Sequence, residues 1–412
     1  MTTAHLDAAW LREPPLSEIL AALDAAGEQA RIVGGAIRNT LLREARGDVD
    51  IATTALPAEV IGRVERAGFK TVPTGIEHGT VTVVADGRPF EVTTLRQDVE
   101  AFGRRAKVVF GRDWKRDAER RDFTMNALSA TRDGAIYDYV GGLADVHARR
   151  VRFIGNPTIR IAEDYLRILR FFRFHAAYGE GAPDPDALAA CIAARAGLER
   201  LSRERIRMEF MRLLTAKGAV SMLQLMSESG LLDEVLAGVP LLTSFARMVA
   251  LEHTMDIAPD PLRRLGALAV SVTEDAGRLR ERLRLANAEH ERLVCMGEEW
   301  RSVSPAEGEQ GGRRLLYRLA SERFVDVVLL AWSRSTADAD DQSWRMLTAL
   351  PARWTAPIFP LKSTHFIRRG IAKGPKLGAA IAAAEKAWMR ADFPMDAASL
   401  DAIADAVMGE IG

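Results

Sequence analysis

The sequence has few cysteines and no long apolar run. Its two cysteines, Cys191 and Cys295, stand far apart and outside any C-x-x-C pair. This spacing excludes a zinc site of the paired-cysteine type and suits a reducing cytoplasm. No apolar stretch approaches membrane-spanning length, and the opening MTTAHLDAAWLREPP lacks the apolar core of a signal peptide. We therefore expect a cytoplasmic protein with no membrane partner.

The chain also has no net charge and no His-Asp dipeptide. Its 56 basic and 56 acidic residues give a formal net charge of zero, so the field of the whole molecule does not attract nucleic acid. The charges are locally segregated, however, and local patches are what phosphate contacts require. None of the seven histidines is followed by Asp, which argues against an attached phosphohydrolase.

What is present is typical of a globular protein of several domains. Apolar residues make up 48% and charged residues 27% of the 412 residues, and this length predicts two to four units. Helical and strand patterns mix up to about residue 157, and amphipathic helical patterns dominate beyond it. We predict an α+β fold with a mixed-sheet head at 1–157, followed by a helical neck at 158–235, a helical body at 236–345 and a helical tail at 346–412.

The stretch IVGGAIRNTLLREARGDVDIAT at residues 32–53 begins with a feature of phosphate binding. A short apolar strand runs into Gly34 and Gly35, and a helical pattern follows. Two glycines let backbone N–H groups approach an anion at the start of a helix, whose dipole favours phosphate. Arg38, one turn further on, can reach the same phosphates. This part of the stretch predicts contacts with a nucleoside triphosphate.

The same stretch ends with closely spaced carboxylates. Because successive strand side chains point to opposite faces, Asp48 and Asp50 are expected to project from one face of a strand. Two carboxylates this close repel each other unless a divalent cation lies between them. Glu91 alternates with apolar neighbours in the run FEV and is the candidate third carboxylate. Together these residues predict a Mg²⁺–nucleotide site with Asp48 and Asp50 as metal ligands.

Local patterns predict the elements around these residues. A helix is expected at 57–67, and two alternating runs joined across 85–89 predict a hairpin. Residues 97–117 have no clean period and predict a long mobile loop. The segment 137–157 predicts a Gly-Gly turn and a strand.

Several segments together resemble one family. GGAIRN…GDVDIAT, HGTVTV, FEVTTLR, RRDFTMNAL and AEDYLRILRFFRF, within residues 31–175, resemble the signature set of bacterial-type (class II) tRNA nucleotidyltransferases and poly(A) polymerases. These enzymes belong to the DNA polymerase β-like nucleotidyltransferase superfamily. LSRERIRMEF at 201–210 resembles the end of the family's neck. GIAKGPKLGAAIAAAEKAWMR at 370–390 resembles a tail element in which a Gly-Pro turn and a helix start engage tRNA phosphates.

The resemblance implies a role for each matching residue. It makes Asp48, Asp50 and Glu91 the catalytic carboxylates, with Asp48 and Asp50 on the metal. The implied nucleotide contacts are Gly34, Gly35, Arg38, Arg121, Asp122, Asn126, Asp164, Arg167, Arg170 and Arg173. The implied RNA contacts are Lys373, Gly374 and Lys376. The chain departs from the family at Asn39, Arg43 and Gly47, where Asp, Gly and Lys are usual.

The resemblance assigns Asp164 and Arg167 to recognition of the incoming base. The hydrogen-bonding groups of these two side chains also explain a preference for C and A over U and G. They are three residues apart on an apparent helix, so they are expected to face the same way. A carboxylate only accepts hydrogen bonds and a guanidinium only donates them. Cytosine and adenine both present an amino donor beside a ring-nitrogen acceptor, whereas uracil and guanine present the reverse. The pair therefore accepts C and A without a template. A plain surface ion pair is the alternative.

The leading hypothesis is a CCA-adding tRNA nucleotidyltransferase, which adds CTP, CTP and ATP to the 3′ end of tRNA. A poly(A) polymerase of the same family is the nearest alternative, but its usual basic extension and longer loop before RRDFT are not evident. A CC-adding partner enzyme is disfavoured because about twenty residues remain in that loop. A non-catalytic RNA-binding protein is disfavoured by the three carboxylates. The sequence does not predict the oligomeric state.

Overall fold

The computed structural model describes residues 4–102 and 105–411. The chain divides into two compact units, Met1–Ala237 and Gly238–Gly412. The predicted head and neck fall in the first unit, and the predicted body and tail fall in the second. The finer division into four domains remains a prediction. No helix in the described part of the chain is both long and apolar enough to cross a membrane.

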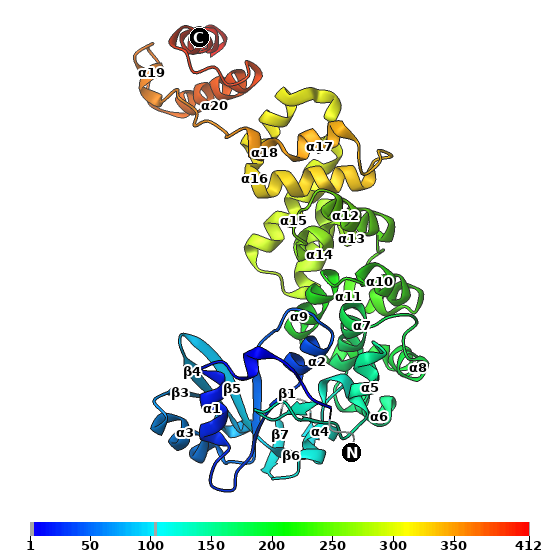
Figure 1. Ribbon diagram of the computed structural model, residues 1–412. Helices are drawn as coiled ribbons and strands as arrows, with labels where there is room; N and C mark the ends of the chain where they lie inside the picture. Colours follow the sequence, from blue (N-terminus) through cyan, green and yellow to red (C-terminus); the bar gives the residue numbers. More distant parts are fainter. Residues whose placement is uncertain (1–3, 103–104, 412) are drawn as a thin grey trace. The chain divides into compact units, whose positions relative to one another are not determined.

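Within the described residues, seven strands of the first unit form one mixed sheet in the order β3-β4-β5-β2-β1-β8-β9 (Figure 1). Its strands are β1 (Ala30–Val33), β2 (Asp50–Thr53), β3 (Lys70–Gly75), β4 (Thr80–Ala85), β5 (Arg88–Thr94), β8 (Ser129–Ala130) and β9 (Ile136–Tyr137). The β2–β5 pair is parallel and the other pairs are antiparallel. This sheet, followed by helices, confirms the α+β prediction.

Two helices, α1 (Leu16–Leu23) and α3 (Pro57–Arg66), contact each other and pack against the sheet (Figure 1). Helix α3 matches the predicted helix at 57–67. Proline begins it, where a missing N–H is tolerated, and Val60 and Val64 bury one face against the strands. The other short helices of the head are η1 (Ala9–Leu11), α2 (Gly35–Leu41), η2 (Ile76–His78), η3 (Thr124–Asn126) and α5 (Gly142–His147).

The predicted hairpin at 85–89 is confirmed as the β4–β5 connection. Ala85 pairs with Arg88, so the turn consists of Asp86 and Gly87. Both turn residues have positive φ, 52° and 73°, as the two-residue turn that matches strand twist requires. In β5, Phe90 and Val92 are buried while Glu91 is exposed, so the alternation read from the sequence holds.

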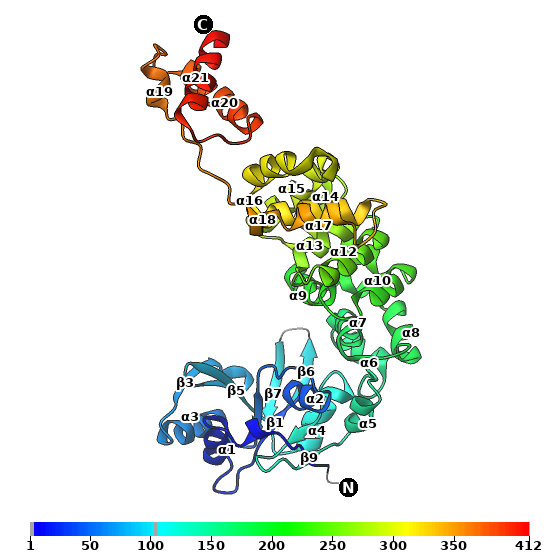
Figure 2. The ribbon, with the colours of Figure 1, turned by 45° about the horizontal axis from the view of Figure 1, so that its top comes forward.

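The prediction of a loop at 97–117 is wrong. The backbone there forms an antiparallel hairpin, β6 (Arg96–Phe102) and β7 (Arg105–Phe110), followed by α4 (Trp114–Glu119) (Figure 2). Asp113 caps α4 by accepting hydrogen bonds from the N–H groups of Lys115 and Arg116. A second correction concerns 137–157, where the predicted strand is replaced by α5 and a single bridge between Phe123 and Phe153.

Beyond that bridge the described residues of the first unit form helices and their connections. These are α6 (Pro157–Glu163), α7 (Leu166–Tyr178), α8 (Pro185–Ala193), η4 (Arg195–Arg200), α9 (Arg203–Leu214), α10 (Ala219–Glu228) and α11 (Leu231–Leu236). Phe171 and Phe174 of α7 pack against Phe123, with ring centroids 6.4 and 5.0 Å away. Helix α7 is therefore packed against head residues on one side, and it contacts α9 and α10 as well.

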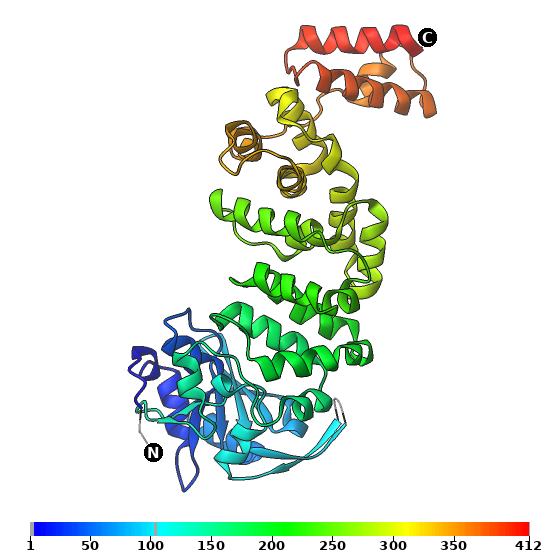
Figure 3. The same ribbon diagram turned by 90° about the vertical axis from the view of Figure 1, so that its right-hand side faces the viewer.

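The second unit is helical throughout its described residues. Its elements are α12 (Leu242–Thr254), α13 (Pro261–Ala269), α14 (Thr273–Leu283), α15 (Asn287–Glu299), η5 (Trp300–Ser302), η6 (Pro305–Glu307), α16 (Gly308–Arg334), α17 (Gln342–Thr348), α18 (Leu350–Arg353), α19 (Ser363–Ile367), α20 (Pro375–Arg390) and α21 (Ala397–Ile411). Helix α16 is broken at Ala320, whose φ is 60°. Helices α20 and α21 pack side by side around Phe366, Ala380, Ala384 and Ala404 (Figure 3).

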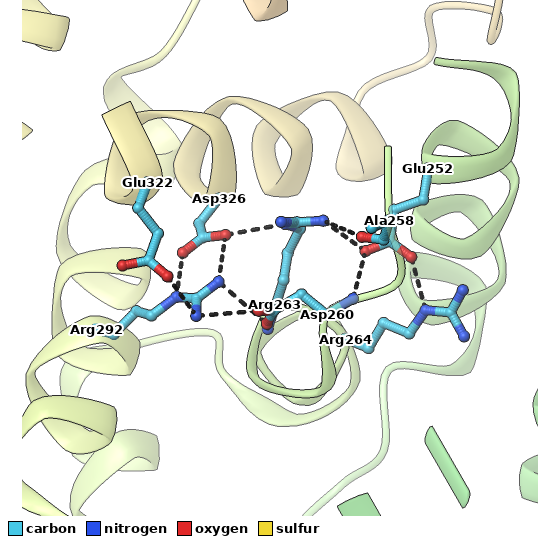
Figure 4. Close-up of polar contacts among 8 residues, drawn as sticks. All are labelled: Glu252, Ala258, Asp260, Arg263, Arg264, Arg292, Glu322 and Asp326. Atoms are coloured by element: carbon cyan, nitrogen blue, oxygen red, sulfur yellow. Dashed lines mark hydrogen bonds and ion pairs between the residues drawn. The ribbon is translucent and has the colours of Figure 1, made fainter. Parts of the chain in front are cut away.

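A buried ionic network joins four helices of the second unit (Figure 4). Asp326 of α16 is fully buried and accepts hydrogen bonds from Arg263 of α13 at 2.9 Å and Arg292 of α15 at 2.5 Å. Glu252 of α12 accepts from Arg263 and from Arg264, both at 2.7 Å. Each arginine therefore faces a carboxylate, as buried charges require.

Candidate active site

One cavity of about 690 Å³ in the first unit gathers most of the residues that the sequence singled out. Glycines, carboxylates, arginines and two aromatic rings form its wall. The lining residues are Gly34, Gly35, Arg38, Asn39, Gly47, Asp48, Asp50, Arg121, Asp122, Asn126, Asp164, Leu166, Arg167, Arg170, Phe174, Tyr178, Arg205 and Arg212. A wall with six arginines beside four aspartates suits a polyanion that is bound together with a cation.

The carboxylates lie at the start of β2. Asp50 is the first residue of this strand and is in register with Glu91 on the neighbouring parallel strand β5, so their side chains share one face of the sheet. Asp48 lies before the strand rather than within it, which corrects the prediction that both aspartates alternate along a strand. Val49 and Ile51 are buried, as predicted. Asp48 and Asp50 both line the cavity, and Glu91 lies beside them without lining it.

Electrostatics within this group raise the pKa of Asp50 to about 6. Burial is the largest cause, the charge of Glu91 is the next, and Asp48 adds to it, while Arg121 acts in the opposite direction. The negative charges of Glu91 and Asp48 thus oppose ionisation of Asp50, and a cation would relieve this repulsion. In the described residues no three His, Cys, Asp or Glu side chains converge closely enough to enclose a metal by themselves. Asp48 and Asp50 instead fit an open site that substrate oxygens complete.

Gly34 and Arg38, the predicted triphosphate contacts, both line the cavity. Gly34 has a φ of 71°, and a Cβ added there would lie 3.3 Å from the Arg121 guanidinium, so both backbone conformation and space favour glycine. Arg38 is 5% exposed and stacks on the Tyr178 ring at 3.8 Å. Burial is the main cause of its lowered pKa. A hydrogen bond to Asn126 fixes the guanidinium further.

The family departures at Asn39 and Arg43 are accommodated locally. The Asn39 side-chain oxygen accepts hydrogen bonds from Arg38 at 2.8 and 3.1 Å, and its amide donates to the carbonyl of Ala45 at 2.9 Å. An asparagine can therefore hold Arg38 through its oxygen, as a carboxylate would. Arg43 adopts a φ of 57°, the left-handed conformation that glycine takes without strain.

Asp122 and Arg170 form the centre of a second polar cluster. Asp122 accepts hydrogen bonds from Arg170 at 2.8 Å and from Asn126 at 3.1 Å. Burial would raise the pKa of Asp122, but Arg170 and Asn126 outweigh it, so the pKa lies below its usual value. Arg170 also pairs with Glu209 at 3.3 Å. This cluster holds an arginine of α7 at the cavity wall.

Arg173 does not line the cavity with the other predicted contacts. Its guanidinium bonds Glu209 at 2.5 Å and packs over the Phe174 ring at 4.3 Å. Glu209, which is 1% exposed, was not singled out from the sequence. Glu209 lies within LSRERIRMEF, five residues before the last residue of α9, and the resemblance of that segment to the family's neck was the available signal. The structure gives Glu209 two arginine partners from α7, and it thus ties α9 to α7.

The backbone around Asp164 and Arg167 differs from the predicted continuous helix. Helix α6 ends at Glu163 and α7 begins at Leu166, and Asp164 between them is extended, with φ −156° and ψ 106°. Asp164 and Arg167 nevertheless line the same cavity. Their side chains do not pair with each other, because Arg167 bonds Glu163 at 2.6 Å and Asp164 bonds Arg205 at 2.7 Å. The alternative of a simple Asp164–Arg167 surface ion pair is therefore not what the structure contains.

Other cavity residues were missed or left unassigned by the sequence reading. Leu166, Phe174 and Tyr178 belong to the α7 segment, whose pattern was read mainly as core. Arg205 and Arg212 belong to α9, and neither is among the predicted nucleotide contacts. Only the fold shows that these residues of α7 and α9 face the head carboxylates.

The predicted RNA contacts lie in the second unit. Lys373, Gly374 and Lys376 line a separate cavity of about 420 Å³ at the start of α20. Both lysines are exposed, and Gly374 precedes the first residue of the helix, Pro375. The neighbouring Arg369 pairs with Asp401 and Asp405 at 2.5 and 2.8 Å. Lys373 and Lys376 thus keep their positive charges at the surface.

Known proteins resemble the chain over most of its length. The family described as "Poly A polymerase head domain" matches residues 30–152, and "Probable RNA and SrmB- binding site of polymerase A" matches 182–245. The mitochondrial CCA tRNA nucleotidyltransferase 1 of Danio rerio is 32% identical over 382 residues, covering 89% of this chain and 85% of the relative. The CCA-adding enzyme of Limosilactobacillus fermentum is also 32% identical over 382 residues, covering 89% and 90%.

A solved structure agrees with these relatives. The Bacillus stearothermophilus CCA-adding enzyme in complex with CTP superposes with a TM-score of 0.72 at 28% identity, covering 92% of this chain and 94% of that one. The mixed sheet and its carboxylate-lined cavity define a nucleotidyltransferase. Given the relatives at 32% identity over nearly the full length, the chain belongs to the family of CCA-adding tRNA nucleotidyltransferases.

Proposed function

We propose that the protein adds C, C and A to the 3′ end of tRNA from CTP and ATP, without a template and with release of pyrophosphate. One observation carries the proposal. A single cavity combines the acidic pair at β2 with arginines and with the Asp164–Arg167 segment, in a chain whose relatives are named CCA-adding enzymes. The acidic pair suits nucleotidyl transfer, and Asp164 with Arg167 suits a choice of C and A.

The residues have distinct roles in this proposal. The 3′ hydroxyl of the RNA gives up its proton to solvent and its oxygen forms a bond to the α-phosphorus. The bond from the α-phosphorus to the bridging β-phosphate oxygen breaks, and pyrophosphate leaves. Asp48 and Asp50, with Glu91 beside them, would hold Mg²⁺. When bound, Mg²⁺ supplies positive charge that activates the attacking hydroxyl and stabilises the leaving pyrophosphate. Gly34, Gly35 and Arg38 bind the triphosphate.

The other cavity residues orient the nucleoside. Asp122, held by Arg170 and Asn126, and Arg121 line the same cavity as Asp50 and Asp164 and contact ribose and phosphate in this proposal. Arg173 would act indirectly, because its guanidinium is bonded to Glu209 rather than directed into the cavity. Base choice falls to Asp164 and Arg167, which supply an acceptor and a donor that match cytosine and adenine.

The test of this function uses tRNA transcripts that end at the discriminator base. Each nucleotide is supplied singly and in mixtures, and the products are sequenced. We expect two C additions with CTP alone, CCA with CTP and ATP, and no extension with UTP or GTP. Growth of poly(A) on unrelated RNA would indicate a poly(A) polymerase, and termination after CC would indicate a CC-adding enzyme. Absence of any transfer would indicate a non-catalytic RNA-binding protein.

Asp164→Ala is expected to relax base choice without abolishing transfer. The variant removes the acceptor that recognises the amino group of C and A, so UTP and GTP should gain relative to CTP by roughly tenfold in kcat/KM, or about 1.4 kcal/mol. Single-nucleotide incorporation assays measure this ratio. Asp186→Ala, at an exposed position of α8, is the matched control. An unchanged preference for C and A in Asp164→Ala would contradict the assignment.

Loss of Lys373 and Lys376 is expected to weaken tRNA binding but not nucleotide use. The two exposed lysines beside Gly374 would contact RNA phosphates. The K373Q/K376Q variant should therefore have a KM for tRNA roughly tenfold higher than the wild type. The slope of log Kd against log salt concentration should also fall by about one to two, because fewer counterions are released on binding. The KM for CTP should not change. Lys386→Gln, exposed further along α20, is the control. Equal tRNA affinity and salt slope in the wild type and the double variant would remove these lysines from the interface.

Mg²⁺ binding is expected to weaken as pH falls through about 6. Asp50 has a pKa raised to about 6, so protons compete with the cation below that pH, and affinity should fall about fourfold between pH 7.5 and 5.5. The Mg²⁺-dependent rise in melting temperature measures this without nucleotide, whose phosphates also titrate in this range. A rise in melting temperature that is independent of pH would contradict it.

A further inference from the structure

The Asp164 carboxylate has a partner that the sequence reading did not assign. Arg205 of α9 donates from Nη2 to Asp164 Oδ2 at 2.7 Å, across 41 residues of chain. The backbone N–H of Leu166 donates to the other oxygen, Oδ1, at 3.1 Å. Both Asp164 and Arg205 line the cavity. The carboxylate is therefore held at both oxygens, once by its own segment and once by a helix of the neck.

Arg167 is held by a different set of groups. Its Nη1 donates to Glu163 Oε2 at 2.6 Å, and the same carboxylate oxygen accepts from Arg160, also at 2.6 Å. Arg205 takes no part in these contacts. The proposed acceptor, Asp164, and the proposed donor, Arg167, are thus positioned by different groups. Of the two, Arg205 bonds Asp164.

The position of Asp164 explains why it needs an external support. It lies between two helices with an extended backbone. Its carbonyl accepts from the Arg167 N–H at 3.1 Å, which fixes the backbone but not the side chain. The terminal torsion of an aspartate is broad, and a carboxylate held at one oxygen can rotate. The hydrogen bond from Arg205 Nη2 to Oδ2, added to that from the Leu166 N–H to Oδ1, fixes the plane of the carboxylate and leaves its remaining lone pairs in defined directions.

We propose that Arg205 is a positioning residue for base selection, which orients the Asp164 carboxylate so that it accepts from the amino group of cytosine or adenine. The inference rests on the proposed function, in which Asp164 reads the base. Partial exposure supports this role over a purely structural one, because the side chains of Arg205 and Asp164 are 24% and 31% exposed. Solvent-screened pairs of this kind contribute little to stability.

The test compares Arg205→Ala, Arg205→Lys and the control Arg203→Ala, which removes an arginine of the same helix outside the cavity. Steady-state kcat and KM are measured for CTP, ATP, UTP and GTP on tRNA that lacks CCA. We expect Arg205→Ala to lower the preference for CTP over UTP, and for ATP over GTP, roughly tenfold in kcat/KM. Arg205→Lys should recover part of the preference, because an ammonium keeps the charge but not the planar fork. Melting temperatures should match the control.

A double variant separates this inference from the proposed function. If Arg205 acts through Asp164, Arg205→Ala should not relax base choice further in an Asp164→Ala background. Wild-type protein that adds neither C nor A would overturn the proposed function itself, and an unchanged preference in Asp164→Ala would overturn its base reader. Relaxed choice in Asp164→Ala with full selectivity in Arg205→Ala and Arg205→Lys would overturn the role of Arg205 alone. So would a lower KM for CTP with intact selectivity, which would show that Arg205 competes with the base.

Discussion

The Asp50→Asn protein is expected to fold and to bind CTP while its nucleotidyl transfer falls by roughly 10³-fold or more, equivalent to about 4 kcal/mol of transition-state stabilisation. Asp50 opens β2 in register with Glu91 and lines the cavity beside Asp48. Asparagine keeps the size of the side chain but removes the negative charge that would hold Mg²⁺. Single-turnover incorporation of CTP into tRNA measures the loss, and equilibrium binding of CTP provides the comparison.

The stability of the same variant is expected to move in the opposite direction. The pKa of Asp50 in the folded protein, about 6, lies above its ordinary value of 3.8, so the ionised carboxylate opposes folding above pH 6. Without divalent cations at pH 7.5, Asp50→Asn should therefore melt no lower than the wild type. This combination of lost activity and retained or increased stability is typical of a functional charge.

Asp86→Asn is the matched control for Asp50→Asn. Asp86 lies in the exposed β4–β5 turn with a φ of 52°, a conformation that asparagine also adopts readily. The control should keep wild-type transfer and stability. Near-normal transfer by Asp50→Asn would remove this residue from the chemistry, and a large drop in its melting temperature would show that Asp50 is structural.

Local patterns in the sequence predicted the elements that carry the acidic group. The alternation Phe90-Glu91-Val92 placed Glu91 on the exposed face of a strand, and Asp86-Gly87 fixed the hairpin before it. These features depend on a period of two and on turn residues, which act over a few positions. Pairing of Asp50 with Glu91 depends on a parallel contact across 41 residues, and only the folded sheet provides it.

The break between α6 and α7 could not be predicted from local pattern. The segment PTIRIAEDYLRILRFF keeps a helical period, and neither proline nor glycine stands near Asp164 to mark an end. The buried faces of Ile161 and Leu169 agree with the period on both sides of the break. Tertiary contacts of Asp164 with Arg205, and of Arg167 with Glu163, accompany the extended residue. The prediction of a continuous helix was therefore wrong where the local helical preference of the segment competes with contacts to residues distant in the sequence.

The ionic network of the second unit was equally invisible in the sequence, because its members look like ordinary surface charges. Glu252, Arg263, Arg292 and Asp326 stand on four different helices, and no sequence motif connects them. Their burial becomes evident only when the helices pack together (Figure 4). Charged side chains are rarely fully buried unless they are paired, and the pairing partners here come from different helices.

Asp326→Ala is expected to destabilise the second unit by about 3–5 kcal/mol, the range measured when one partner of a buried ion pair is removed. Asp326 is fully buried and bonds both Arg263 and Arg292, so its loss leaves two buried guanidinium groups short of a partner. Burial alone would lower the pKa of Arg292, and Asp326, Asp260 and Glu322 raise it. Asp260 and Glu322 remain in the variant, and a guanidinium is in any case not deprotonated in proteins, so Arg292 stays charged. Urea unfolding of the full chain, followed by tryptophan fluorescence, measures the change.

Glu322→Ala is the control that separates burial from charge. Glu322 also pairs with Arg292, at 3.1 Å, but its side chain is 71% exposed, so its removal should change stability by about 0.5 kcal/mol or less. Nucleotide binding in the first unit should persist in both variants, because none of the network residues lines that cavity. Equal unfolding midpoints for Asp326→Ala and Glu322→Ala would show that the helices of the second unit do not depend on the buried carboxylate. A selective loss in Asp326→Ala would show that packing the four helices requires every guanidinium of the network to keep its partner.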